Sequence, residues 1–347
     1  MRRKRWIAPV ALVLAFAVAA AVGSAASAKR SARQATLKVA VVTDIGGLND
    51  KGFNQSANAG RLEVQRKLKM PTKVFVTQSA NDRLPNLLLA ARQGYNLIFG
   101  IGFFMGDPLN SVAPQFPNDK FAGVDVNYST DLPGKPKNVR GLQFREQEAG
   151  YLVGYIAGLV TKYSPKKPQV VSGIGANPVP AIVRYLAGYK AGAKKANPKV
   201  TVINSYANDL TFNDQAKCKE VALNQLQRKT QVIFTAAGGC GLGGLNAANS
   251  AGRWGIGVDT NQNYLHPKTM LTSALKEVQN AVFLTAKAFK KSPSKFKGGF
   301  NVNFTLKNGG VGVAPINKRA PKRALIMKKL TQIKKAIIAG KIKVPSK

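Results

Sequence analysis

Short apolar segments and segments with helical spacing alternate along almost the whole chain. The apolar segments are rich in β-branched residues and predict strands, and the helical segments between most of them include residues 57–68 and 181–196. The predicted strands are residues 37–44, 73–79, 96–102, 120–126, 139–144, 169–175, 199–206, 231–237, 254–259 and 270–275. Strict alternation of strand and helix is typical of parallel sheets built from β-α-β units. The sequence therefore predicts an α/β fold.

The predicted strands fall into two groups, one on each side of a long helix predicted over residues 146–162. A chain of 347 residues is longer than one compact core usually holds, so two domains are expected. We expect two Rossmann-like lobes with parallel sheets, joined by a hinge. Lobe 1 would comprise residues 37–144 and about 262–299, and lobe 2 residues 145–261 and about 300–347.

Past Asp259 the alternation changes. Residues 271–276 are interpreted as a strand that returns to the first lobe, followed by a helix over residues 277–289. Residues 300–306 alternate apolar and polar side chains. Residues 324–338 form a basic amphipathic pattern, which predicts a helix packed on the second lobe.

The N-terminus matches the three regions of a secretory signal peptide, residues 1–28. MRRKR is positively charged, residues 6–22 are apolar, and small residues follow, with cleavage expected after Ala28. An uncleaved anchor helix is the alternative, because about 17 apolar residues lie at the short limit for spanning a bilayer. No cysteine lies near the cleavage site. We therefore expect a protein secreted across the cytoplasmic membrane to the periplasm or cell envelope, without a lipid anchor.

The chain is strongly basic, with 53 Lys and Arg against 15 Asp and Glu and a formal charge of +38. Residues 278–347 contain 17 Lys or Arg and no Asp or Glu. Such a field favours nucleic acid, an anionic membrane surface or an anionic wall polymer as a neighbour. For a secreted protein, anionic envelope polymers fit better than any specific nucleic acid, and a solvated surface of lysines is the plainer explanation.

Cys218 and Cys240 are the only cysteines. An even number in an oxidising compartment predicts a disulfide. Cys218 falls in the first turns of a predicted helix and Cys240 follows the next strand, so a β-α-β crossover places both at one edge of the sheet. Closing this loop should stabilise the fold by about 3 kcal/mol. Two free buried thiols are the alternative.

Four of the scarce carboxylates fall at or just beyond the C-terminal ends of predicted strands. They are Asp44, Asp107, Asp125 and Asp259. Ligands of open α/β sheets bind at these strand ends, and a carboxylate there accepts hydrogen bonds from sugar hydroxyls or ring N–H groups. Each residue alone is as well explained as a helix cap, but together they predict a ligand site between the lobes. Glu146 and Glu148 open a helix, where the helix dipole explains them.

Two aromatic residues stand near the predicted site. Phe53 and Asn54 begin the helix after Asp44, where an aromatic ring beside an amide suits a planar ligand that can be stacked upon and hydrogen-bonded. Phe212, in the loop NDLTFND, would close the sandwich from the second lobe. The alternatives are that Phe53 pins its helix to the sheet and that Phe212 is a hydrophobic staple at a helix start.

Indications of catalysis are few. Residues 239–244 fit G-x-G-x-x-G and Asp259 ends the following strand, as in dinucleotide-binding folds. Their place in the second lobe, the cysteine within the motif and the scarcity of NAD outside the cell argue against an enzyme. The single histidine, His266, lies in a turn that suits neither a triad nor a metal site. We expect a binding protein rather than an enzyme, with no cofactor and no metal; a polyanion-binding envelope protein and a dinucleotide-dependent enzyme remain alternatives.

The chain resembles the basic membrane protein family of ABC-transporter substrate-binding proteins, whose known members include purine-nucleoside receptors. The matching segments, in order between Leu37 and Ser346, are VVTDIGGLNDKGFNQSA, REQEAGYLVGYIAGL, AAGGCGLGGLNAA, WGIGVDTNQNYL, LTSALKEV and IIAGKIKVPS. The resemblance implies a type I periplasmic-binding fold, with two α/β lobes, a three-segment hinge and the ligand in the closed cleft. It also implies a nucleoside as ligand, with a permease and an ATPase as partners.

The resemblance further implies roles for single residues. In the motif D-x-G-G-x-x-D-x-x-F-N, Asp44 would bind the ribose or a neighbouring polar edge, Phe53 would stack on the base and Asn54 would hydrogen-bond it. Asp107, in G-F-x-x-x-D, would accept from the base edge, and Phe212 would be the second stacking ring.

In the second lobe, the resemblance gives Gly239 backbone contacts with the ligand, gives Asp259 the ribose hydroxyls and places Lys276 of TSALK nearby. The chain departs from the family in three respects. It has no lipobox cysteine, it carries Tyr185 where relatives have Phe, which we interpret as a packing change, and its cysteine pair is not general in the family, so we expect that pair to serve stability.

Overall fold

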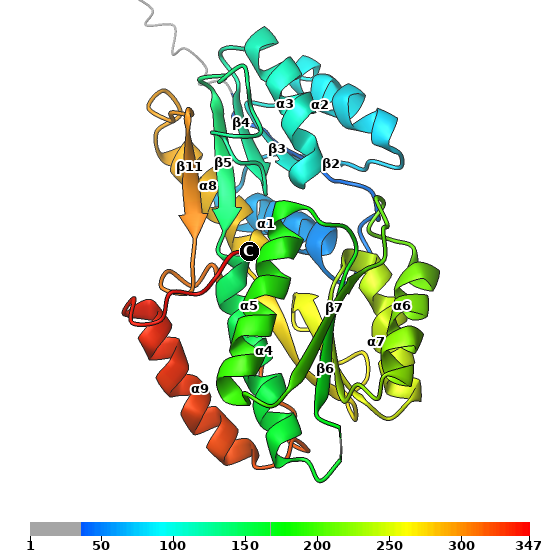
Figure 1. Ribbon diagram of the computed structural model, residues 1–347. Coiled ribbons are helices and arrows are strands. Elements are labelled where there is room, and N and C mark those ends of the chain that lie inside the picture. The colour runs from blue at the N-terminus through cyan, green and yellow to red at the C-terminus, as the bar shows by residue number, and fades with distance from the viewer. Residues whose placement is uncertain (1–35, 167) are drawn as a thin grey trace, which may run out of the picture. The chain divides into compact units, whose positions relative to one another are not determined.

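The computed structural model describes residues 36–166 and 168–347 (Figure 1). The predicted signal peptide, residues 1–28, lies outside the described residues. None of the helices in the described part of the chain combines the length and the apolar character that crossing a bilayer requires.

The described chain forms two sheets of six strands each. The first has the order β11-β5-β4-β3-β1-β2 and is entirely parallel. Its strands are β1 (Val39–Val42), β2 (Thr72–Phe75), β3 (Leu97–Ile101), β4 (Lys120–Val124), β5 (Val139–Phe144) and β11 (Phe300–Phe304). Together with the helices that cover it, this sheet makes up lobe 1.

The second sheet has the order β12-β10-β9-β8-β6-β7, with β12 antiparallel to β10 and the other pairs parallel. Its strands are β6 (Val170–Gly175), β7 (Thr201–Tyr206), β8 (Val232–Ala236), β9 (Trp254–Asp259), β10 (Met270–Lys276) and β12 (Val311–Val313). This sheet and its helices make up lobe 2.

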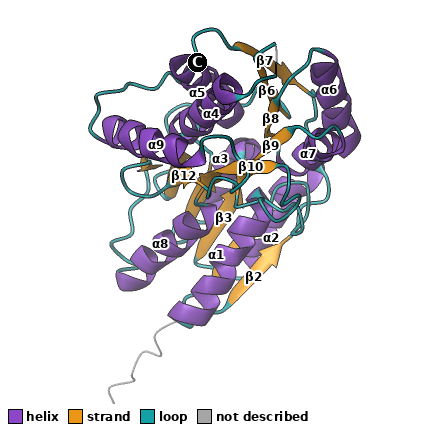
Figure 2. Ribbon diagram, turned by 90° about the horizontal axis from the view of Figure 1, so that it is seen from below, coloured by secondary structure: helices purple, strands orange, loops and turns teal. Residues whose placement is uncertain are grey.

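Helices cover both faces of each sheet, which is why the central strands are apolar on both sides. In lobe 1 they are α1 (Phe53–Leu68), α2 (Arg83–Arg92), α3 (Gly106–Val112) and α8 (Val278–Lys291). In lobe 2 they are α4 (Glu146–Tyr163), α5 (Pro180–Ala196), α6 (Gln215–Gln227) and α7 (Gly241–Ser250), and α9 (Arg323–Ile338) packs on α4. Figure 2 shows α4 and α5 on one face of the second sheet and α6 and α7 on the other. The predicted α/β class and two-lobe fold are confirmed.

Within residues 36–166 and 168–347, the chain passes between the lobes three times, after β5, β10 and β11. The crossing segments are bonded to one another: Arg145 N–H donates to Phe304 O at 2.9 Å, and Glu277 N–H donates to Gly310 O at 3.0 Å. These three segments form the hinge that the resemblance implies.

The strand pairing corrects the expected lobe boundaries. Residues 270–276 do not return to lobe 1, because β10 pairs with β9 and β12 in the second sheet. Residues 300–304, expected in lobe 2, form β11 beside β5 in the first sheet (Figure 1). Burial explains both outcomes: most of β10 is buried and needs a neighbour on each side, whereas the half-exposed β11 suits a sheet edge.

Helices α4 and α5 pack backbone against backbone. A Cβ atom added at Gly154 would lie 2.1 Å from Tyr189 O, and one at Gly192 would lie 2.0 Å from Tyr151 O. Only glycine leaves room for this approach. The glycines in YLVGYIAGL and in YLAGYKAGA therefore fix the helix layer on this face of lobe 2.

Candidate ligand-binding site

A cavity lies between the lobes and is lined from both. Lobe 1 contributes residues that follow β1, β3 and β4. Lobe 2 contributes residues that follow β6, β7 and β8, together with the last residues of β9 and β10. These are the carboxyl ends of parallel strands, where open α/β sheets bind ligands. The cavity therefore lies where the sequence predicts a ligand site, at the strand ends between the lobes.

The structure brings seven of the eight predicted ligand residues to this cavity. They are Asp44, Phe53, Asn54, Phe212, Gly239, Asp259 and Lys276. Asp125, the remaining strand-end carboxylate, also lines it.

Asp107 is the exception. It is exposed in the first turn of α3 and is absent from the cavity lining. A short 3₁₀ helix, Phe103–Met105, intervenes between β3 and α3 and places Phe103 and Phe104 at the cavity instead. The position of Asp107 fits the helix-terminus alternative, since a carboxylate in the first turn interacts favourably with the helix dipole.

Aromatic rings from the two lobes meet at the cavity. The rings of Phe104 and Phe212 lie edge to face, with centroids 6.3 Å apart. The Arg83 guanidinium carbon lies 4.8 Å from the centroid of the Phe104 ring. Phe104 was not predicted, although its place after a buried strand, beside Phe103, is a signal that sequence reasoning could have used.

Asp44 forms an ion pair that the sequence did not reveal. Its Oδ1 accepts hydrogen bonds from Arg83 Nε and from Ile45 N–H, each at 2.8 Å. Burial raises the pKa of Asp44 above its usual value, and the Arg83 guanidinium opposes this rise. Nothing in the sequence distinguishes Arg83 from the other basic residues.

Asn54 lines the cavity, but its amide group is used within the protein. Its Nδ2 donates to Asp44 O at 3.2 Å and to Ile45 O at 3.0 Å, and its Oδ1 accepts from Asp44 N–H at 3.3 Å. In this structure Asn54 therefore fastens the β1–α1 turn, a role that differs from the predicted hydrogen bond to a base.

A buried ion network joins the lobes at the base of the cavity. Lys276 Nζ, at the end of β10, lies 2.6 Å from Asp125 Oδ2 of lobe 1 and 2.9 Å from Glu146 Oε1. The other oxygen of Glu146 lies 2.6 Å from Arg184 Nε. Burial alone would lower the pKa of Lys276, but the surrounding carboxylates outweigh it and raise the pKa. The role of Glu146 thus exceeds the predicted helix-dipole interaction.

Asp259 is buried at the end of β9 and lines the cavity. Burial raises its pKa to about 7; Lys276 opposes this rise, and the nearby carboxylate of Asp125 adds to it. Asp259 and Asp125 both have left-handed backbone conformations, with φ of 63° and 64°. Each lobe therefore turns its chain sharply at a strand-end carboxylate.

Tyr185 combines packing with a place at the cavity. Its ring packs edge to face on Phe234, with centroids 5.8 Å apart. Tyr185 lines the cavity, and its buried hydroxyl has no hydrogen-bond partner among the described residues. Burial, followed by the charge of Asp259, raises the pKa of Tyr185 well above its usual value. The prediction of a packing change therefore captured only part of its position.

The glycines of residues 239–244 mainly serve packing. Gly239 lines the cavity. A Cβ atom at Gly243 would lie 1.9 Å from Gln215 O, so this glycine lets α7 approach α6. Cys240 is joined to Cys218 in a disulfide, with 5.5 Å between their Cα atoms.

Comparisons with known proteins agree with this geometry. The family described as "ABC transporter substrate-binding protein PnrA-like" matches residues 37–347. The chain is 36% identical over 368 residues to the "ABC transporter nucleoside-binding protein BmpA" of Lactococcus lactis subsp. cremoris, covering 99% of this chain and 100% of the relative. It is 35% identical over 321 residues to basic membrane protein A1 of Borrelia garinii subsp. bavariensis, covering 92% of this chain and 91% of the relative.

Among solved structures, an ABC transporter solute-binding protein from Aeropyrum pernix K1 matches with a TM-score of 0.76 at 27% identity, covering 90% of this chain and 94% of that chain. The chain therefore belongs to the family of PnrA-like ABC transporter substrate-binding proteins, which are extracytoplasmic solute-binding proteins of the periplasmic-binding fold.

Proposed function

We propose that the protein binds a nucleoside, with a purine base, in the cavity between its lobes and presents it to the permease and ATPase of an ABC importer. The observation that carries this proposal is the meeting of Phe53 and Phe212, from opposite lobes, at a cavity that also holds the carboxylates of Asp44 and Asp259. Aromatic faces suit a base, and carboxylates suit the hydroxyls of a ribose. A relative with 36% identity is named as a nucleoside-binding protein.

In this proposal Phe53 and Phe212 hold the base between them, and Asp259 accepts hydrogen bonds from the ribose hydroxyls. Asp44, held by Arg83, faces a polar edge of the ligand, and Gly239 contributes its backbone. Lys276 lies 5.1 Å from the centroid of the Phe53 ring and places a positive charge among the buried carboxylates of Asp125 and Glu146.

The proposed cellular setting is the periplasm or cell envelope, reached through the signal peptide and without a lipid anchor. The family implies a small-molecule ligand and transporter subunits as partners. Import rather than export is part of the proposal.

Isothermal titration calorimetry tests this function with protein refolded from denaturant, so that no ligand is carried over. Adenosine, guanosine and inosine should bind, pyrimidine nucleosides more weakly because their rings offer less stacking area, and free ribose weakest. Phe212→Ala should weaken binding by about tenfold or more, since stacking on one aromatic ring contributes about 1–3 kcal/mol per base. Phe300→Ala, on the exposed edge strand β11, is the matched control.

Absence of binding by every nucleoside at millimolar concentration would contradict the proposal. Tight binding of NAD without binding of nucleosides would favour the dinucleotide enzyme instead. Native mass spectrometry of the protein as purified offers an independent check, because a co-purified ligand can be identified by its mass.

A second candidate function is binding of an anionic envelope polymer. It is favoured by the 17 basic and no acidic residues between positions 278 and 347, among them the exposed Lys328 and Lys335 of α9. Retention on polyphosphate beads should then fall steeply with salt, as counterion release requires. Replacing both lysines with Gln should reduce that salt dependence and leave nucleoside binding unchanged.

A further inference from the structure

The two lobes present their aromatic residues on loops with the same six-residue pattern, N-D-x-x-F-N. In lobe 1 it reads Asn49-Asp50-Lys51-Gly52-Phe53-Asn54, and in lobe 2 it reads Asn208-Asp209-Leu210-Thr211-Phe212-Asn213. Each copy directly precedes or begins a helix, α1 in lobe 1 and α6 in lobe 2. The phenylalanine of each copy lines the cavity.

The aspartate of each copy accepts the same set of backbone hydrogen bonds. Asp50 accepts from the N–H groups two, four and five residues ahead, at 3.0, 2.7 and 3.0 Å. Asp209 accepts from the N–H groups at the same three offsets, at 2.9, 2.8 and 2.9 Å. Both carboxylates are buried. A buried carboxylate with three charge-assisted bonds to one short loop fixes the backbone on both sides of the phenylalanine.

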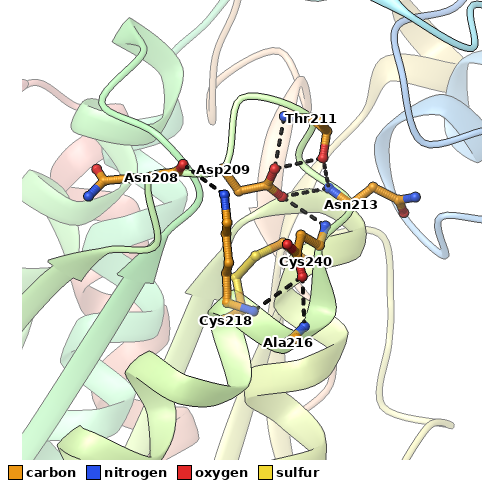
Figure 3. Close-up of a disulfide and its surroundings, with 9 residues drawn as sticks. Asn208, Asp209, Thr211, Asn213, Ala216, Cys218 and Cys240 are labelled. Carbon is orange, nitrogen blue, oxygen red and sulfur yellow. Dashed lines mark hydrogen bonds between the residues drawn. A yellow bond between two sulfur atoms is a disulfide. The ribbon is translucent and has the colours of Figure 1, made fainter.

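The lobe 2 copy has further attachments, and Figure 3 shows the Asp209 carboxylate with its loop partners beside the disulfide. The Asp209 carboxylate also accepts from the Thr211 hydroxyl at 2.6 Å. Cys240 N–H donates to Phe212 O at 3.0 Å, and Cys240 is tied through its sulfur to Cys218 on α6. A Cβ atom at Gly238 would lie 3.0 Å from the same carbonyl oxygen, so the two loops are in backbone contact.

Phe212 needs such support because of its backbone conformation. Its φ is +57°, in the left-handed region that bulky side chains disfavour. A residue keeps this conformation only where the surrounding structure imposes it. The bonds that Asp209 and Cys240 make with the backbone of residues 211–214 are the ones that impose it here.

We propose that Asp209 and the Cys218–Cys240 disulfide are positioning elements for ligand binding, which hold Phe212 with its ring at the cavity, and that Asp50 is the matching element for Phe53. This inference rests on the proposed nucleoside-binding function. Asp209 gives the cleaner test, because among the described residues Asp50 lines the cavity and Asp209 does not. A change at Asp209 can therefore alter ligand affinity only by changing the conformation of the loop that carries Phe212.

A double-mutant cycle tests the coupling, with adenosine, guanosine and inosine as probes in calorimetry. Asp209→Asn removes acceptor capacity from the loop and should weaken binding by about tenfold. In a Phe212→Ala background the same substitution should change the affinity by less than about twofold, because the residue it positions is gone. Asp214→Asn is the matched control: Asp214 caps α6, and Asn serves equally well as a cap.

The disulfide is tested in the same way. The double variant Cys218→Ala/Cys240→Ala should weaken binding by about fivefold in the presence of Phe212 and leave the Phe212→Ala background unchanged. Thermal unfolding confirms that each variant is folded at the temperature of the titration. Should the cysteine variant fail to fold, the Asp209 cycle still decides the proposal.

Hydrogen exchange of the ligand-free protein provides a readout that does not depend on the ligand. The amides of residues 211, 213 and 214 should exchange at least about tenfold faster in Asp209→Asn and keep their wild-type rates in Asp214→Asn. Unchanged rates, or losses of affinity that add independently in the cycle, would overturn the proposal. If wild-type protein binds none of the nucleosides, the proposed function fails, while the exchange comparison still shows whether Asp209 orders the loop.

Discussion

The two aromatic loops share a capping aspartate but differ in what fastens them to the rest of their lobe. In lobe 1 the Asn54 side chain makes three hydrogen bonds with the backbone of Asp44 and Ile45. In lobe 2 the equivalent side chain, Asn213, is exposed and makes no hydrogen bond within the described residues, and the disulfide of Cys240 takes its place. Both loops therefore use a buried aspartate. They differ in the second attachment, which is a set of side-chain hydrogen bonds in lobe 1 and a disulfide in lobe 2.

Two sets of contacts join the lobes. Thr260 and Gln262 of lobe 2 donate hydrogen bonds to Lys51 O of the lobe 1 loop, at 2.8 and 3.0 Å. The ion network around Lys276 is the second set.

Lys276→Met should lower the free energy of unfolding by about 4 kcal/mol, because it leaves Asp125 and Glu146 as buried charges without their partner. Chemical denaturation measures the change. Lys268→Met, at an exposed lysine just before β10, should have almost no effect, and equal losses in the two variants would contradict this account.

The helix layers offer a second comparison between lobes. Gly154→Ala, in the α4–α5 contact of lobe 2, should cost about 3 kcal/mol, because the new methyl group meets a carbonyl oxygen at 2.1 Å. Gly60→Ala, in the α1–α8 contact of lobe 1, should cost less, since the corresponding distance to Gln279 O is 2.7 Å. Urea unfolding curves rank the two variants. A larger loss for Gly60→Ala would show that α4 and α5 can move apart more easily than their backbone contact indicates.

The same substitution at the two equivalent asparagines, Asn54 and Asn213, compares how the two loops are attached. Asn54→Leu should lower the free energy of unfolding by about 2 kcal/mol, since it leaves backbone groups of Asp44 and Ile45 without partners. It should also weaken nucleoside binding by about tenfold, because the turn that holds Asp44 loosens. Asn213→Leu should leave stability nearly unchanged. Thermal unfolding and calorimetry measure the changes in stability and affinity. Similar losses of stability and affinity in both variants would contradict the proposed difference between the two loops.

The strand-end carboxylates differ in how their charge is balanced, and pH reveals the difference. Because burial raises the pKa of Asp259 to about 7, the folded state holds this proton more tightly than the unfolded state. The associated stability is present below about pH 4 and is lost as the pH rises to about 7. Asp259→Asn should therefore be more stable than wild type at pH 8, by about 1–2 kcal/mol, and equally stable near pH 4.

Urea denaturation between pH 4 and pH 8 measures this effect, and parallel curves for the two proteins would contradict it. Asp125→Asn is the informative counterpart in lobe 1. Asp125 lies 2.6 Å from Lys276, so its replacement should destabilise the protein at neutral pH. The Asp259 variant should lose nucleoside affinity even though it gains stability.

Most of the fold was predictable because its signals are local. Each of the ten predicted strands overlaps an observed strand, since buried parallel strands are short apolar runs whatever their neighbours are. The lobe assignment of β10 and β11 was not predictable in this way. It depends on which strand lies beside each of them, and apolar content records burial but not partners. The three-residue strand β12 is too short to show a period.

In the candidate site too, some features follow from the local sequence and others depend on tertiary packing. The positions of Asp44, Asp125 and Asp259 follow from their places at strand ends, which the chain order fixes. The exposure of Asp107 depends on a single 3₁₀ turn, and the pairing of Asp44 with Arg83 joins residues far apart in the sequence. Such details arise from tertiary packing and leave no local pattern.

The three crossings of the hinge also bear on how the chain reaches its folded state. Lobe 1 receives α8 and its edge strand β11 only after all but the last pieces of lobe 2 have been made (Figure 1). During synthesis, which proceeds from the N-terminus, the outer edge of β5 therefore stays unpaired until residues 300–304 are made. One face of α1 likewise stays uncovered until α8, residues 278–291, is made. Neither lobe is a self-contained folding unit, so the two must complete their folding together and late. A chain that ended before β11 would present a free strand edge, which is a template for aggregation.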